Sequence, residues 1–247
     1  MTETILATLD LDLAVALLVA IAAGMAHGFT GFGGALVAMP LYTVLFGPVE
    51  ALAILVFAGV VGSAQLTLPA MRIARWPHLI PMMAAAIIFT PLGVLSLVTI
   101  DPDLIRRAIG ILVLLGALVI GFGWTYKGPR NTATGAAAGA LAGYLTGATG
   151  MGGPPLAAYM LAFPDPADVQ RANIVLMTAL LITTTLIGLI VAGSYHPETI
   201  VRTILLTPVY MFGAWWGGRL FHSRFQTLFR RVAIGLLVAG GIIALAA

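Results

Sequence analysis

Long apolar segments separated by short polar ones run along nearly the whole chain. The hydrocarbon core of a bilayer, ~30 Å thick, needs ~20 apolar residues of α-helix, so each long segment predicts a membrane-spanning helix. The pattern therefore predicts an all-α polytopic membrane protein. Its predicted spans are at about residues 49–70, 78–99, 104–124, 168–193, 199–221 and 229–247.

Two further apolar regions are interrupted by glycine clusters, at residues 31–34 and 150–153. Each flanking piece is ~11 to 17 residues long, which is short for a full crossing at ~1.5 Å per residue. We predict two glycine-broken helical hairpins that enter the membrane and return, with pairs of short tilted helices as the alternative. The flanking pieces are 11–27 and 34–46 in the first region, and 132–148 and 153–163 in the second.

The second cluster repeats the first at an offset of 119 residues, which also aligns Gly28 with Gly147. A later pair, Arg106-Arg107, is followed by an apolar run that is echoed after Arg230-Arg231. The chain is therefore predicted to consist of two repeats, 1–125 and 132–247, joined by a linker at 126–131. Each repeat would contain one broken hairpin followed by three transmembrane helices.

The composition excludes a soluble globule, because 60% of the residues are hydrophobic, 9% are charged and the mean hydropathy is +1.06. The net charge of +3 does not predict a nucleic-acid partner, since Lys and Arg cluster at segment ends where they set topology. The absence of cysteine excludes disulfides and thiolate metal sites. Acidic residues precede the first apolar run, so a removable signal peptide is not expected.

The basic residues also predict how the repeats are oriented. By the positive-inside rule, the loops near 72–77, 125–131 and 222–230 are cytoplasmic, whereas those near 101 and 196 are not. Corresponding loops then face opposite sides, which gives the repeats inverted topology and places both termini outside. The Arg106-Arg107 pair on the predicted outer side argues against this orientation. Inverted repeats would bring the two glycine breaks together near the bilayer midplane, an arrangement that suits alternating access.

The glycine breaks are the candidate binding site. A helix that restarts after a break presents unpaired N–H groups and the positive end of its dipole, which favour an anion. The alternative is that the glycines only allow close helix packing. The candidate substrate-binding residues are Thr30, Gly31, Phe32, Gly33, Gly34, Thr149, Gly150, Met151, Gly152, Gly153, Asn173 and Arg219.

Three of the polar candidates have competing interpretations. His27 is a candidate anion contact or proton carrier, because an unperturbed histidine titrates near neutral pH; a neutral ring bonded to a backbone carbonyl is the alternative. Asn173 is predicted to bond another helix or to contact substrate. Arg219, although near a segment end where arginines reach the interface, is the better candidate cation of the pair Arg171 and Arg219.

Enzymatic and ATP-driven classes are not favoured, because the chain has no G-x-S-x-G, H-E-x-x-H or G-x-x-x-x-G-K-[ST] motif. No metal or cofactor is expected, given four histidines and no cysteine. The residues favour a secondary transporter of a small oxyanion. A passive anion channel and a non-transporting membrane scaffold or sensor remain alternatives.

The two glycine motifs resemble those of the TauE/SafE family of sulfite and organosulfonate exporters. The resemblance rests on Gly28–Gly34 with Pro40, and on Gly147–Pro155 with Arg171-Ala-Asn173, and it extends over essentially the whole chain. It implies a multi-pass permease of the bacterial cytoplasmic membrane that exports small sulfur-containing anions. It leaves open the exact anion, the coupling ion and whether the protein forms a homo-oligomer.

Overall fold

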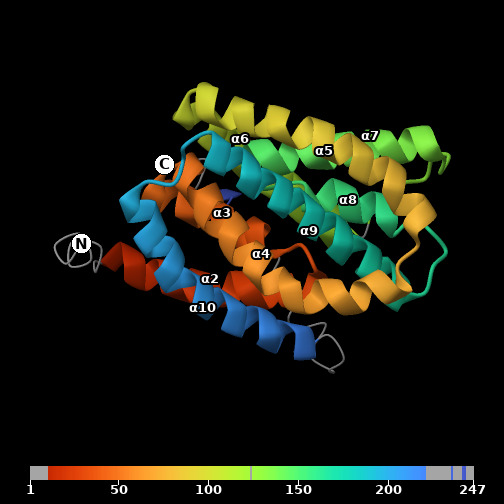
Figure 1. Cartoon of the computed structure of the whole chain (residues 1–247), viewed down its shortest axis with the longest axis horizontal. Coiled ribbons are helices and arrows are strands. Elements are labelled where there is room, and N and C mark those ends of the chain that lie inside the picture. The colour runs from red at the N-terminus through yellow and green to blue at the C-terminus, as the bar shows by residue number, and fades with distance from the viewer. Residues whose placement is uncertain (1–10, 123, 221–234, 236–240, 243–247) are drawn as a thin grey trace.

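A computed structural model of the protein describes residues 11–122, 124–220, 235, 241 and 242, and its regular elements there are all α-helices (Figure 1). The all-α prediction is confirmed, while the predicted last span at 229–247 lies almost wholly outside the described residues. The first half contains α2 (Leu11–Thr30), α3 (Gly34–Phe46), α4 (Pro48–Ile73), α5 (Trp76–Thr99) and α6 (Pro102–Phe122). The second contains α7 (Thr132–Thr149), α8 (Gly153–Met160), α9 (Ala167–Val191) and α10 (Pro197–Leu220).

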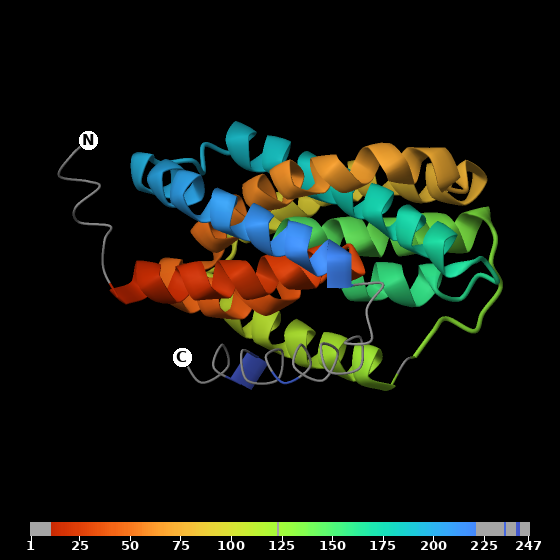
Figure 2. The ribbon, with the colours of Figure 1, turned by 90° about the horizontal axis from the view of Figure 1, so that it is seen from below.

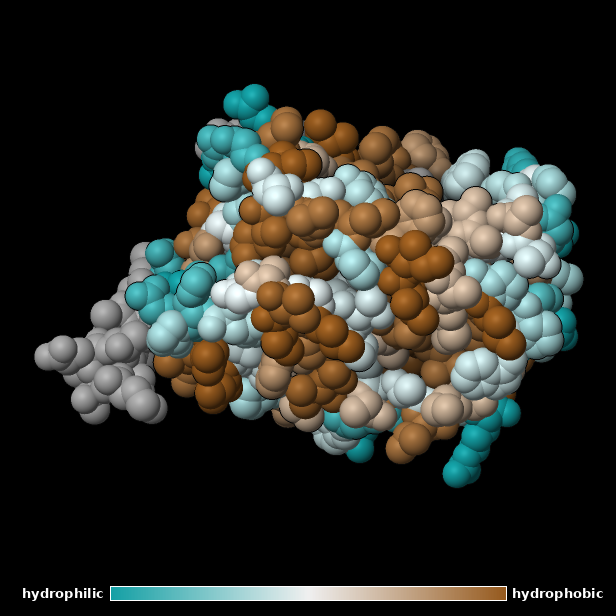
Figure 3. Space-filling model, turned by 45° about the horizontal axis from the view of Figure 1, so that its top comes forward, coloured by the Kyte–Doolittle hydropathy of each residue, from teal (hydrophilic) through white to brown (hydrophobic). Residues whose placement is uncertain are grey.

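The helices form a bundle whose surface is apolar in the middle and polar at the ends. Among the described residues, α2, α4, α5 and α9 are long and apolar enough to cross a bilayer, and α3 is a shorter apolar helix. Figure 3 shows hydrophobic residues over the waist of the bundle and hydrophilic ones toward the two ends of its long axis. This distribution fits a multi-pass membrane protein surrounded by lipid at its waist.

Both glycine-broken segments fold into antiparallel helical hairpins. In the first, the Tyr42 hydroxyl near the end of α3 donates a 2.9 Å hydrogen bond to the Ala16 carbonyl near the start of α2. In the second, the hydroxyl oxygens of Thr134 on α7 and Tyr159 on α8 lie 3.2 Å apart. The chain therefore reverses at each glycine cluster, and the clusters form the tips of the hairpins.

The arms of the hairpins are unequal, which differs from the prediction. α2 has 20 residues and α7 has 18, whereas α3 has 13 and α8 has 8. The expectation that every piece is too short to cross is wrong for α2, because that helix continues past Gly28 as far as Thr30. A single glycine inside a helix costs only ~1 kcal/mol relative to alanine, and close packing at Gly28 offsets this cost.

Each hairpin packs against a helix from the other half of the chain. α10 lies along α2, α5 lies along α7, and α4 packs against α9 between them (Figures 1 and 2). A Cβ atom added to Gly28 would lie 1.9 Å from the Ala214 carbonyl oxygen, and one added to Gly147 would lie 2.2 Å from the Thr90 carbonyl oxygen. Both contacts need glycine because a carbonyl oxygen of a helix from the other half lies where a Cβ atom would be. Each half therefore packs one of its helices against the hairpin of the other half in the same way.

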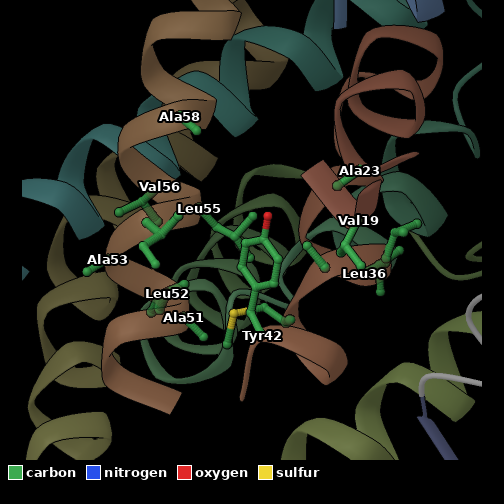
Figure 4. Close-up of a cluster of buried hydrophobic side chains, with 14 of the residues drawn as sticks. Val19, Ala23, Leu36, Tyr42, Ala51, Leu52, Ala53, Leu55, Val56 and Ala58 are labelled. Carbon is green, nitrogen blue, oxygen red and sulfur yellow. The ribbon is translucent and has the colours of Figure 1, made fainter. Parts of the chain in front are cut away.

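An apolar cluster supports the first hairpin from the side of α4. Figure 4 shows Leu52, Leu55 and Ala58 on α4 at one side of the cluster, and Val19 and Ala23 on α2 with Leu36 and Tyr42 on α3 at the other. These side chains are all buried. The cluster holds α3 between α2 and α4, and it thereby fixes the position of the first glycine tip.

Candidate functional site

The two glycine tips have the same backbone geometry. Gly31 and Gly150 both have positive φ, at 86° and 73°, a conformation that glycine adopts without the penalty of a Cβ atom. Their N–H groups donate to the carbonyl four residues earlier, at 2.7 and 2.9 Å. Gly33 and Gly152 then occupy the N-cap positions of α3 and α8 with nearly identical dihedral angles. Each tip therefore ends one helix and starts the next with the same turn.

The tips contact one another in the interior of the bundle. A Cβ atom added to Gly153 would lie 2.4 Å from the ring of Phe32, so the absence of a side chain at Gly153 makes room for that ring. Gly150 faces Met39 and Ala35 of the first hairpin in a similar way. Residues about 120 positions apart in the sequence thus meet at one place.

A small cavity of about 30 Å³ lies beside this contact. A cavity needs ~10 to 15 Å³ on this measure to hold one water molecule, so it has room for a compact polar group. Its lining includes both tips together with α4, α9 and α10. The apolar part of the lining comes mainly from Leu52, Leu55, Val56, Leu181 and Ile182, and the polar side chains are His27, Thr146, Thr178 and Tyr210.

Two of the four polar side chains already have hydrogen-bond partners. The Thr146 hydroxyl donates to the Ala142 carbonyl at 2.7 Å, and His27 Nε2 lies 3.1 Å from the Ser63 hydroxyl. The observed partner of His27 is thus a side-chain hydroxyl, whereas the alternative interpretation expected a backbone carbonyl. The ring of Tyr210 lies 5.9 Å from that of His27, which places both at the first tip.

The other two polar side chains have hydroxyls without a partner among the described residues. Thr178 Oγ1 is buried and makes no hydrogen bond. The Tyr210 hydroxyl also makes none, and it lies so close to Gly34 that an added Cβ atom there would be 2.3 Å from it. Buried polar groups normally find partners, so both hydroxyls are available for a bound molecule.

Unpaired N–H groups are more numerous at the first tip than at the second. The Thr30 hydroxyl accepts hydrogen bonds from the N–H groups of Phe32 and Gly33, at 3.2 and 2.8 Å, and donates to the Ala26 carbonyl at 2.8 Å. The next N–H groups, at residues 34–36, have no acceptor in the described part of the chain, as expected for the first turn of a helix. In α8 the corresponding turn contains Pro154 and Pro155, which have no N–H.

The cation nearest the first tip is Arg171, whereas Arg219 lies elsewhere. Arg171 Nη2 on α9 donates a 2.8 Å hydrogen bond to the Gly28 carbonyl, in the last turn of α2. Arg219 is exposed at the end of α10, with its guanidinium carbon 3.6 Å from the centre of the Trp215 ring. The structure therefore does not bring Arg219 to the cavity, because a cation–π contact holds it at the surface.

The remaining predicted residues fall into two groups. His27, Phe32, Gly150 and Gly153 line the cavity, and Gly34 adjoins it. The others lie in the turns or away from the cavity. Gly31, Gly33 and Gly152 shape the turns, and Met151 is buried in the core. The Thr149 hydroxyl donates to the Leu145 carbonyl. Asn173 Oδ1 accepts a hydrogen bond from the Arg75 N–H at 2.9 Å.

The predictions missed Tyr210 and Thr178. A signal existed for Thr178, since it follows Gly59 by the repeat offset of 119 residues and both line the cavity. Tyr210 is one aromatic residue among several in an apolar segment, and the sequence contains nothing that distinguishes it. Its role follows only from the packing of α10 along α2.

Polar contacts join the two halves at each end of the bundle. Near the start of α4, Glu50 forms a 2.8 Å ion pair with Arg202, and the Tyr195 hydroxyl donates to the Ala53 carbonyl at 2.8 Å. Burial raises the pKa of the Tyr195 phenol above its usual range, so this donor stays protonated. Past the end of α4, Arg75 forms a 2.9 Å ion pair with Asp165. The cavity thus lies between two sets of contacts that hold the halves together.

Comparison with known proteins gives one clear match. The family model described as sulfite exporter TauE/SafE matches residues 16–243 of the chain. Neither a curated protein nor a solved structure matches it.

Proposed function

Because the chain belongs to the sulfite exporter TauE/SafE family, we propose that it is a secondary transporter that exports small sulfur-containing anions such as sulfite or organosulfonates. The observation that supports this most is the cavity where the two glycine tips meet, with its two unpartnered hydroxyls. Unpaired N–H groups at the start of α3 add further donors and the positive end of a helix dipole. These groups suit an oxyanion, whose oxygens accept hydrogen bonds.

In this proposal residues 1–125 and 132–247 are two repeats of inverted topology. The reciprocal packing of α10 on α2 and of α5 on α7 supports a two-fold relation between them. Alternating access follows if one repeat rocks against the other around the site. The ion pairs Glu50–Arg202 and Arg75–Asp165 then open in turn, each at its own end of the bundle.

The proposed orientation follows from the basic residues. Arg72, Arg75, Lys127 and Arg130 lie at the end of the bundle where α4 ends and α7 begins, which we assign to the cytoplasm of a bacterial cell (Figure 1). The membrane potential, negative inside, then favours export of an anion by ~2.3 kcal/mol per charge per 100 mV. No ATP-binding motif is present in the sequence, so the energy would come from this potential or from an ion gradient.

Flux in reconstituted liposomes tests the proposal. We expect uptake or release of labelled sulfite that saturates with concentration and is accelerated by unlabelled anion on the opposite side. Conductance far above the turnover of a carrier would instead identify a channel. Absence of both binding and flux in folded protein would favour a scaffold or sensor. A proton-coupling role for His27 stays a prediction, which a pH-gradient arm of the same assay tests with His27→Gln.

A further inference from the structure

The polar lining of the cavity contains donors but no fixed charge. Its described residues include no Lys, Arg, Asp or Glu. His27 is buried beside Ser63 and Tyr210 and has no carboxylate partner among the described residues, so its neutral form is the stable one. Arg171 is hydrogen-bonded to the Gly28 carbonyl and does not line the cavity. An anion bound there is contacted by neutral groups, and the positive charge of Arg171 next to the first tip acts on it from outside the lining.

Tyr210 is the first of two hydroxyls that stand out from similar groups nearby. It is 3% exposed, and its hydroxyl lies against Gly34 at the start of α3 without a hydrogen-bond partner among the described residues. The equally buried Tyr42 behaves differently, since its hydroxyl donates to the Ala16 carbonyl. The Tyr210 hydroxyl therefore lies beside the unpaired N–H groups of the first turn of α3, and all of them can donate to one oxyanion.

Thr178 is the second. A threonine inside a helix usually donates to the carbonyl four residues earlier, as Thr184 and Thr185 do on the same helix, at 2.9 and 2.8 Å. Thr178 is 8% exposed, lines the cavity and makes no such bond. Its hydroxyl hydrogen is thus free for a ligand, although a carbonyl acceptor is normally within reach in a helix.

Neutral donors discriminate between anions by charge. The cost of moving an ion out of water rises with the square of its charge, so a dianion costs about four times as much as a monoanion of the same size. A helix N-terminus contributes the equivalent of only about half a positive charge. Hydroxyls and N–H groups can replace the hydration of one negative charge far better than that of two.

From these observations, and resting on the proposed function, we infer that the site selects singly charged oxyanions, such as hydrogensulfite or an organosulfonate, over sulfite and sulfate dianions. Tyr210 and Thr178 are the side chains that determine this specificity. Each donates a hydrogen bond to an oxygen of the anion, alongside the N–H groups at the start of α3. The transported species of sulfite is then its protonated monoanion.

Equilibrium binding to the purified full-length protein at one fixed pH tests the inference. Methanesulfonate and sulfate have the same number of heavy atoms and a similar shape, but they carry one and two charges. We expect methanesulfonate to bind at least about tenfold more tightly, the equivalent of one good hydrogen bond to a charged group. Sulfate binding as tightly or more tightly would overturn the inference but leave the anion transporter standing. Binding of neither anion would contradict the proposed function itself.

Matched variants test the two hydroxyls. Tyr210→Phe and Thr178→Val should each weaken methanesulfonate binding by about five- to tenfold. Tyr42→Phe and Thr185→Val remove hydroxyls that already have backbone partners, so they should leave the affinity unchanged. Unchanged affinity in both Tyr210→Phe and Thr178→Val would overturn the assignment. The comparison of the two anions needs only the wild-type protein, so it decides the question even where a variant fails to fold.

Discussion

The two glycine tips have the same backbone conformation but offer different chemical groups. Both turn at a glycine with positive φ and restart a helix from a glycine N-cap. At the first tip the new helix offers unpaired N–H groups, and His27 lies beside them. At the second, Pro154 and Pro155 remove those N–H groups, and Thr146 replaces His27. The two turns have the same backbone geometry, but only the first offers several unpaired N–H groups.

The residues around the two tips also favour an anion at the first tip over the second. Arg171 bonds to the Gly28 carbonyl and offsets the negative end of the α2 dipole next to the first tip. The residue that corresponds to Arg171 at the repeat offset is Leu52, which lines the cavity as part of its apolar wall. An anion should therefore place its charged oxygens toward the first tip and its apolar side toward the second.

The largest expected effect is on the free energy of unfolding, and it comes from the close helix contact that both hairpins make at Gly28 and Gly147. Gly28→Ala and Gly147→Ala each push a Cβ atom into a backbone carbonyl of a helix from the other half. Each should lower the free energy of unfolding by about 3 kcal/mol, as overpacking of a tight interface does. Denaturant titration in detergent measures this. Gly218→Ala is the control, because its nearest neighbour would be 3.7 Å away. A marked loss in only one of the two variants would break the equivalence of the halves.

A smaller loss of stability should distinguish the second tip from the first. A Cβ atom added to Gly152 would lie 2.2 Å from the Ala142 carbonyl oxygen, whereas one added to Gly33 would lie 3.3 Å from the Ala26 carbonyl oxygen. Gly152→Ala should therefore cost about 2 kcal/mol and Gly33→Ala about 1 kcal/mol, the latter through a displaced Thr30 cap. Thermal unfolding of the two variants side by side gives the order. The reverse order would show that the second tip is the looser one.

The charge at the first tip should affect binding more than folding. Arg171→Gln keeps a donor for the Gly28 carbonyl but removes the positive charge, so methanesulfonate affinity should fall about tenfold, or ~1.4 kcal/mol. Arg219→Gln removes an equal charge from the exposed end of α10 and should change the affinity less than twofold. Isothermal calorimetry measures both. A greater loss of affinity with Arg219→Gln would mean that Arg219, and not Arg171, is the positive charge that attracts the anion.

The smallest effect comes from exchanging residues between the tips. Ala35 corresponds to Pro154, so Ala35→Pro places a proline where the other half already accepts one. It removes one N–H from the start of α3 and should weaken methanesulfonate binding about fivefold, or ~1 kcal/mol. Pro154→Ala should leave the affinity unchanged. Equal losses in the two variants would mean that both tips donate to the anion.

Local patterns in the sequence predicted most of the helices. Helix lengths follow from apolar runs that end at Gly, Pro or charged residues, and the predicted spans for α4, α5 and α9 agree with the structure to within about three residues. The break at residues 31–33 was predictable because three glycines within four positions, 31–34, lower helix propensity at one place. The true end of α2 was not, since the packing of Gly28 in its last turn against α10 cannot be read from the local sequence.

The site was less predictable, because its side chains come from distant parts of the chain. Arg171 bonds to a carbonyl 143 residues away, and a position near the end of a segment does not show which interior group an arginine will reach. Tyr210 adjoins Gly34 only because α10 packs along α2. The repeated glycine pattern in the sequence predicted the positions of both tips. It could not predict the differences between the tips, and those differences determine which tip offers hydrogen-bond donors.

The position of a bound anion tests the proposed site most directly. Hydrogenselenite resembles hydrogensulfite and contains selenium, which can be located by anomalous diffraction from soaked crystals. We expect one strong selenium peak in the cavity, with oxygens within hydrogen-bond distance of the Tyr210 and Thr178 hydroxyls and of the N–H groups at the start of α3. A peak at the Pro154 side of the second tip, or beside Arg130 at the end of the bundle with an empty cavity, would contradict it.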